Sequence, residues 1–201
     1  MRRFTFLIPV VAAAAVLAVP AANAGLLDPI SSLVAPTCGS NGYPFSQFGD
    51  SHAYYGFSNN GLEGGSKGYS LAGGAYVGYG NEPWYTNGWG SRSLTLPAGA
   101  SATSPGFCIN LLDPAVRMFT RGSNGGLLQI QVVFHGLTGN VTGIFNLSSQ
   151  SGTGAWTPSN RVGSSLAVPL LTSYAQIRVT AESGTWQVDD LFVDPMISGL
   201  G

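Results

Sequence analysis

The chain has 201 residues, of which 44% are hydrophobic and only 8% are Asp, Glu, Lys or Arg. Its formal net charge is −1 and it has no cluster of basic residues, which excludes binding to nucleic acid or anionic lipid through a basic surface. The 29 glycines and the low charge are compatible with disorder, but the hydrophobic fraction predicts a folded chain.

The first 24 residues have the features of an export signal. Arg2 and Arg3 precede an apolar run over residues 4–19, and Ala-Asn-Ala at 22–24 is the small-x-small pattern of a signal-peptidase site. The run is short for a membrane span, which needs about 20 apolar residues, and no basic stop-transfer cluster follows it. We therefore expect cleavage after Ala24 and a secreted or extracytoplasmic protein with no membrane span.

Removal of the first 24 of 201 residues leaves 177, a length that suits one domain with its own core. Residues 25–37 mix apolar side chains with two prolines and are expected to form a loosely held leader. We expect a single domain over residues 38–195, followed by a short tail over 196–201.

Two cysteines, Cys38 and Cys108, predict a disulfide in an exported chain. The bond would close a loop of about 70 residues and stabilise the fold by roughly 4 kcal/mol in the chain-entropy model. It would also hold the N-terminal segment against the domain.

The pattern of apolar residues after position 38 is that of strands. Residues 127–135 (LLQIQVVFH) and 174–182 (YAQIRVTAE) alternate between apolar and polar side chains, which predicts half-buried antiparallel strands. Shorter candidate strands cover 69–79, 91–96, 106–110, 115–121, 141–146, 164–170 and 185–193. About nine strands, joined by Gly/Ser/Asn turns with no helix between them, predict an all-β antiparallel sandwich.

Catalytic motifs are scarce. The chain has no G-x-S-x-G, H-E-x-x-H or Cys/His metal spacing, and its two histidines are His52 and His135. A Ser–His–Asp triad within GDSH (49–52) would need neighbouring loop residues to converge, which they seldom do. His135 ends a strand on its polar face and is expected to be exposed to solvent. No two carboxylic acids form a recognisable glycosidase pair, so we expect a protein that is not an enzyme.

Aromatic residues gather in one loop-rich segment. Nine of the 20 that follow the export signal lie between Tyr54 and Trp89, and four of these fall in GYGNEPWYTNGWG (78–90). Loop-borne rings offer flat faces on which sugar rings stack, and neighbouring polar side chains can bond sugar hydroxyls. This interpretation assigns ligand binding to Trp84, Tyr85, Trp89, Asn81 and Glu82. The alternative is that the rings pack over the mouth of the sandwich or pin the loop.

Three aspartates occur in GTWQVDDLFVDP (184–195). The apolar residues before the Asp189–Asp190 pair and those after it lie on opposite faces of a simple strand. Either both faces are covered there, or a bulge re-aims the strand. On a simple strand Asp189 points inward and needs a cation, an arginine or N–H donors, and a calcium ion would meet this need. Asp194, before Pro195, is expected to end the strand in a turn.

This ending resembles the closing strand of galactose-binding-like jelly-roll domains, the fold of many carbohydrate-binding modules. NNGLEGGSKGYSL (59–71) is similar to their opening segment, with Leu62 in place of the usual Phe and Tyr69 in place of the usual Trp. The ending is also similar to that of small exported bacterial proteins. The resemblance spans residues 57–195 and implies a jelly-roll sandwich. It also implies a structural calcium ion held by Glu63, Asp189 and Asp190, with Asp189 preferred; the alternative is that the aspartates accept backbone N–H bonds at a bulge.

The leading hypothesis is a secreted, non-catalytic domain that binds polysaccharide or cell-surface glycan through loop aromatics. A second hypothesis is a structural or protein-interaction domain of the cell envelope. It is distinguished by whether the aromatics at 84–89 line an open groove or lie buried. A third is a jelly-roll glycan hydrolase or lyase. It would need two convergent carboxyl groups, or a His/Tyr/Arg cluster in one cleft.

Overall fold

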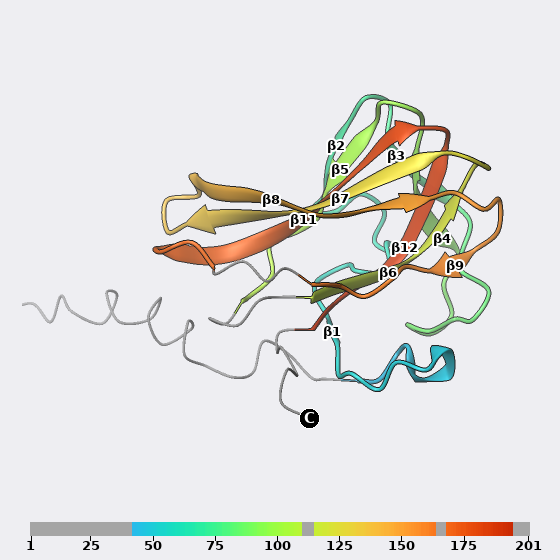
Figure 1. Cartoon of the computed structure of the whole chain (residues 1–201), viewed down its shortest axis with the longest axis horizontal. Helices are drawn as coiled ribbons and strands as arrows, with labels where there is room; N and C mark the ends of the chain where they lie inside the picture. The colour runs from blue at the N-terminus through green and yellow to red at the C-terminus, as the bar shows by residue number, and fades with distance from the viewer. Residues whose placement is uncertain (1–41, 110–114, 164–167, 195–201) are drawn as a thin grey trace, which may run out of the picture.

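The computed structural model describes residues 42–109, 115–163 and 168–194, which form two antiparallel sheets packed face to face (Figure 1). The seven-stranded sheet has the central order β10-β6-β12-β4-β3, with β1 paired to β12 and β9 paired to β6. Its strands are β1 (Tyr55–Gly56), β3 (Tyr76–Tyr79), β4 (Arg92–Leu96), β6 (Ala115–Gly122), β9 (Thr157–Pro158), β10 (Val162–Gly163) and β12 (Trp186–Asp194).

The five-stranded sheet has the order β2-β5-β11-β7-β8. Its strands are β2 (Ser70–Ala72), β5 (Ser101–Thr103), β7 (Leu127–Gly136), β8 (Val141–Ser151) and β11 (Thr172–Ser183). Among the described residues the only helix is the short 3-10 turn η1 (Ser46–Phe48), and no helix there is long and apolar enough to cross a membrane. The predicted all-β antiparallel sandwich is therefore confirmed.

The long alternating segments were the most predictable elements. Residues 127–135 and 174–182 lie in β7 and β11, which pair with each other along most of their length. The predicted strand 69–79 is in fact two strands in different sheets, because Gly73 and Gly74 turn the chain with φ of +67° and +85°. The predicted strand 106–110 contributes one bridge, from Phe107 to Ala175. The described residues form twelve strands rather than about nine, since strands of two or three residues show no alternation.

A hydrophobic core fills the space between the sheets. Both sheets contribute fully buried side chains, among them Leu94, Met118 and Trp186 from the seven-stranded sheet and Ile130 and Phe134 from the five-stranded sheet. Strand β12 therefore presents Trp186 and Val188 to the core, and Gln187 to the opposite, outer face of its sheet.

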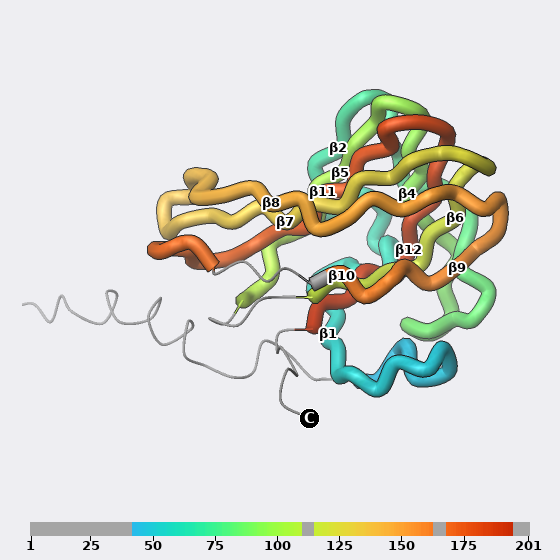
Figure 2. Tube along the Cα trace, in the orientation of Figure 1, coloured from blue at the N-terminus to red at the C-terminus, as the bar shows by residue number. Residues whose placement is uncertain are grey.

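A second cluster covers part of that outer face. Phe45 and Tyr54, from the segment around η1, pack with Phe119 of β6 and Phe192 of β12. The rings of Phe45 and Phe119 stack with centroids 5.1 Å apart. In Figure 2 the segment lies beside β1, on the side of the seven-stranded sheet away from the five-stranded sheet. Both faces of β12 are thus covered in its second half.

Strand β12 also contains the bulge that its sequence suggested. Its pairing with β6 shifts register between Asp189 and Phe192, and Asp190 has a φ of +47°. The extra residue returns Leu191 and Val193 to the core face. Asp189 lies opposite Phe119 of the outer cluster, so it does not share the inward face of Leu191 and Val193. The simple-strand orientation predicted for Asp189 is wrong, and the bulge is the reason.

Several predictions lie outside the described residues. These are the export signal (1–24), the leader (25–37), the tail (196–201) and Cys38. Cys108 is described and is not a free cysteine, but its pairing with Cys38 stays a prediction.

Candidate functional site

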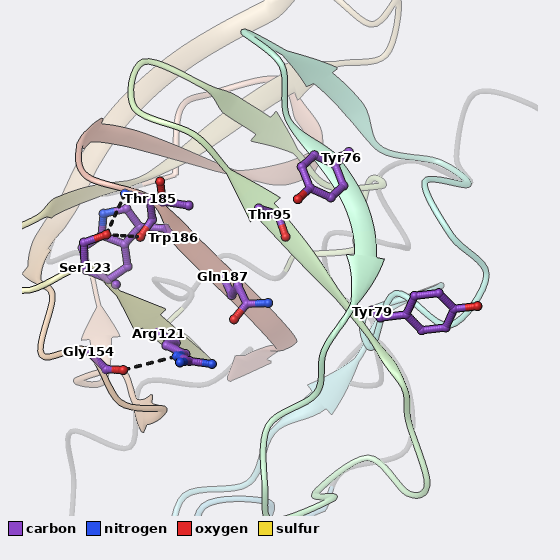
Figure 3. A pocket seen from close by; sticks show the side chains of 10 residues that line it. Tyr76, Tyr79, Thr95, Arg121, Ser123, Gly154, Thr185, Trp186 and Gln187 are labelled. Atoms are coloured by element: carbon purple, nitrogen blue, oxygen red, sulfur yellow. Dashed lines mark hydrogen bonds between the residues drawn. The ribbon is translucent and has the colours of Figure 1, made fainter.

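Four side chains form a row across the outer face of the seven-stranded sheet. Tyr76 of β3 lies directly opposite Thr95 of β4, and Thr95 lies opposite Gln187 of β12. Gln187 in turn lies opposite Arg121 of β6. Since residues directly opposite each other in antiparallel strands share a face, all four point away from the core. We call Tyr76, Thr95, Gln187 and Arg121 the cross-strand row (Figure 3).

The cross-strand row lines an open groove of about 400 Å³, within the size range of ligand sites. Tyr76 is 54% exposed, and Tyr79, at the end of β3, is 86% exposed. Exposed rings beside polar side chains provide both a flat apolar surface and hydrogen-bonding groups. Gly80 lets the chain pass close to Gln187, because a Cβ at that position would lie 2.7 Å from the Gln187 side-chain nitrogen.

Hydrogen bonds within the protein orient two polar side chains of the groove, Arg121 and Gln187. Nε of Arg121 donates to the carbonyl of Gly154 at 3.2 Å, and the Gln187 amide donates to Oγ of Ser93 at 3.4 Å. Sequence reasoning missed this site because its residues come from four strands and share no local motif. The available signal was alternation along three of the strands, because Tyr76, Thr95 and Gln187 each lie between two apolar neighbours. Arg121, between Thr120 and Gly122, has no such signal.

The predicted aromatic loop divides into a packed part and an exposed part. Trp84 packs against Phe48 and Phe119, with ring centroids 4.9 and 5.2 Å away. Tyr85 and Trp89 lie together with centroids 4.8 Å apart and are 44% and 89% exposed. Trp84 therefore serves packing, as the alternative interpretation held, whereas Tyr85 and Trp89 offer an open aromatic surface.

The two tryptophans of this loop should respond differently to truncation. We expect Trp84→Ala to lower the free energy of unfolding by about 2 kcal/mol or more, because it empties a contact between two phenylalanine rings. Trp89→Ala should change it by less than about 0.5 kcal/mol, since the ring is exposed. Urea unfolding followed by circular dichroism measures both; equal losses in the two variants would contradict the assignment.

The two polar residues predicted to bind ligand both form hydrogen bonds within the loop. The Glu82 side chain is fully buried, and its carboxylate accepts the N–H groups of Trp84 and Thr86, the latter at 2.5 Å. The Asn81 side chain donates to the Glu82 carbonyl at 2.8 Å. Glu82 therefore organises the turn and has no surface to offer a ligand.

Glu82 belongs to a cluster of three buried carboxylic acids with Asp189 and Asp190. Asp189 accepts the N–H of Glu82 at 3.1 Å, and Asp190 accepts the N–H of Asn87 at 3.1 Å. Burial raises the pKa of Asp189 to about 8, with the charge of Asp190 adding to the effect. Burial and then the charge of Glu82 raise the pKa of Asp190 to about 7. The cluster thus ties the loop at 81–90 to the bulge of β12.

Glu63 has different partners from the two aspartates with which it was grouped. Its carboxylate accepts the N–H groups of Ser91 and Arg92, both at 2.8 Å. Within residues 42–109, 115–163 and 168–194, no three His, Cys, Asp or Glu side chains are arranged to hold a metal ion. The backbone N–H bonds foreseen for the aspartates are present, and calcium binding by Glu63, Asp189 and Asp190 stays a prediction.

A further polar cluster surrounds Asp50. This carboxylate contacts Nδ1 of His52 at 2.6 Å, accepts the hydroxyl of Tyr54 at 2.7 Å and pairs with Arg117. Burial opposes ionisation of Asp50, but these hydrogen bonds hold its pKa well below the ordinary value. Burial and Asp50 raise the pKa of Tyr54, so that hydroxyl stays protonated and is a weaker acid than an ordinary tyrosine. The groups neutralise one another and fix the segment around η1 to β6.

His135 is only 8% exposed and stacks on Tyr174 at 4.6 Å, so the predicted solvent exposure is wrong; the neighbouring strand supplies the covering ring. The buried carboxylate of Asp194 pairs with Arg161 at 2.8 Å. The turn predicted after Asp194 lies outside the described residues and stays a prediction.

No protein-family model and no curated protein matches the chain. Solved structures do match. Against the Clostridium thermocellum xylanase 10B CBM22-1–GH10 modules complexed with xylohexaose, the TM-score is 0.50 at 14% identity, covering 67% of this chain and 27% of that one. The CBM22-1 xylan-binding domain of Paenibacillus barcinonensis Xyn10C matches with a TM-score of 0.47 at 14% sequence identity. This match covers 67% of this chain and 90% of that one. TmCBM61 in complex with β-1,4-galactotriose matches with a TM-score of 0.44 at 18% sequence identity. This match covers 68% of this chain and 95% of that one. At 14% identity the first of these matches shows the fold alone, and the expected jelly-roll β-sandwich is confirmed.

Proposed function

We propose that this protein is a secreted, non-catalytic domain that binds polysaccharide or cell-surface glycan. The observation that carries the proposal is the cross-strand row on the outer face of the seven-stranded sheet. There the exposed ring of Tyr76 lies in one row across four strands with the hydroxyl of Thr95, the amide of Gln187 and the guanidinium of Arg121. A sugar ring needs this combination: an apolar face for its C–H groups and hydrogen-bonding groups for its hydroxyls.

The shape of the site supports a polymeric ligand. The groove is open, and its side chains come from strands β3, β4, β12 and β6, which lie side by side in the sheet. A rigid sheet holds the side chains in place before the ligand arrives, so little conformational entropy is lost on binding. The exposed pair Tyr85 and Trp89 is a second aromatic surface that a long chain could contact.

The proposal of a non-catalytic role rests on where the carboxylic acid side chains lie. The groove has one charged residue in its lining, Arg121, and no carboxylic acid. Glycosidases place two carboxyl groups on either side of the bond that they cleave. The three clustered acids Glu82, Asp189 and Asp190 are buried and hold the loop.

Affinity electrophoresis tests the function. The purified protein, without its export signal, is run through native gels that contain xylan, β-1,4-galactan, cellulose derivatives or polygalacturonate. We expect retardation on at least one polymer, and no release of reducing sugar from it. Unretarded migration through every gel would contradict glycan binding, and reducing sugar released in proportion to enzyme would contradict the non-catalytic role.

A further inference from the structure

Arg121 is the one charged residue in the lining of the groove. The groove is lined by uncharged residues and by this one cation. The ion pairs among the described residues are His52–Asp50, Arg117–Asp50 and Arg161–Asp194, so no carboxylate there neutralises Arg121. Arg117 and Arg161, in contrast, each form an ion pair with an aspartate. Arg121 is therefore the cation that remains for a ligand in the groove.

The orientation of Arg121 suits a ligand. Its backbone is fixed within β6 and its Nε is fixed by the carbonyl of Gly154. The two terminal nitrogens of the guanidinium are then left to bind other groups, and Figure 3 shows the side chain on the groove side, next to Gln187. A planar guanidinium held in this way matches the two oxygens of a carboxylate.

From these observations we propose that the groove selects glycans that carry carboxylate groups, that is, polymers containing uronic acids. The proposal rests on the proposed glycan-binding function and names its substrate class. The uronate carboxylate accepts from the terminal nitrogens of Arg121, while Gln187 and Thr95 bond ring hydroxyls and Tyr76 contacts the ring face. The net charge of the chain is −1, so a preference for a polyanion has to come from this local cation rather than from the whole protein.

The test compares two soluble oligosaccharides of equal length, tri-galacturonic acid and β-1,4-galactotriose, by isothermal titration calorimetry at low and high salt. We expect the wild type to bind the acidic trimer at least about tenfold more tightly at low salt, with the difference shrinking as salt screens the contact. Arg121→Gln should reduce this preference to within about twofold, because it should lower the affinity for the acidic trimer much more than the affinity for the neutral trimer.

A matched control is Arg178→Gln, which makes the same charge change on β11 of the other sheet. It should bind both trimers like the wild type. Equal affinity of the wild type for the two trimers would overturn the proposal while leaving glycan binding intact. Equal loss in the two arginine variants would also overturn it, because net charge would then explain the preference. Binding of neither trimer, together with no retardation on any polymer, would remove the proposed function itself.

Discussion

Asp190→Asn is expected to make the protein more stable at pH 8 and to flatten its dependence on pH. At φ +47°, residue 190 occupies the left-handed region, which Asn tolerates well. An Asn side chain can accept the N–H of Asn87, as Asp190 does, and can also donate to Glu82. The substitution therefore removes a buried charge and keeps the hydrogen bonds.

The sign of the pH effect follows from the raised pKa values. Below about pH 4 both aspartates are protonated in the folded and unfolded states. Between about pH 4 and pH 7–8 the unfolded chain releases these protons, whereas the folded protein retains them. Folding then binds protons, so the stability of the wild type should fall as the pH rises through this window. Asp50, with its lowered pKa, acts only at more acidic pH.

Thermal unfolding in the presence of chelator measures the effect. For Asp190→Asn we expect a Tm at pH 8 that is higher by roughly 5 °C, from about 1–2 kcal/mol in a protein of this size. Asp194→Asn is the matched control on the same strand. It breaks the buried pair with Arg161 and should lower the Tm. A lower Tm for Asp190→Asn would show that the ionised carboxylate stabilises the fold.

The same measurement tests calcium. If Glu63, Asp189 and Asp190 hold the ion, added calcium will raise the Tm of the wild type and chelator will lower it, because the ligand binds the folded state. The Asp190→Asn variant should then lose this response. A Tm that is equal in chelator and in calcium would count against the metal.

Tyr76→Ala should weaken glycan binding by at least about 30-fold, which corresponds to the 2 kcal/mol typical of an aromatic anchor. The ring is 54% exposed, so its removal should cost little stability and the loss can be assigned to binding. Tyr43→Ala is the control, because Tyr43 is similarly exposed at 63% but does not line the groove. Affinity electrophoresis gives both affinities; equal retardation of Tyr76→Ala and wild type would contradict the site.

The sequence predicted the fold where the pattern was long and local. Strands β7 and β11 alternate over nine residues, and the change of parity at Asp189 and Asp190 predicted either a bulge or two covered faces. It could not give the orientation of Asp189. The orientation of Asp189 depends on whether Asp189 lies before or after the bulge. It also depends on the loop at 81–90, which supplies an N–H donor to its carboxylate.

The candidate site was less predictable because it depends on register. Tyr76, Thr95, Gln187 and Arg121 become neighbours only through the pairing of four strands that are distant in sequence. The packing of Trp84 was equally unpredictable, since its ring is partly buried against Phe48 and Phe119 from other parts of the chain. Glu82 had a usable signal: in a chain with few acids, a Glu inside an aromatic loop was a candidate partner for the buried aspartates.

The central claim is that the cross-strand row binds glycan, and nuclear magnetic resonance tests it most directly. The ¹⁵N-labelled protein is titrated with the oligosaccharide that corresponds to its best-retained polymer. We predict saturable shifts of the Gln187 side-chain amide, the Arg121 Nε–H and the backbone amides of Tyr76 and Thr95. Saturable binding that leaves all four of these signals in place, and moves only signals elsewhere on the protein, would contradict the account.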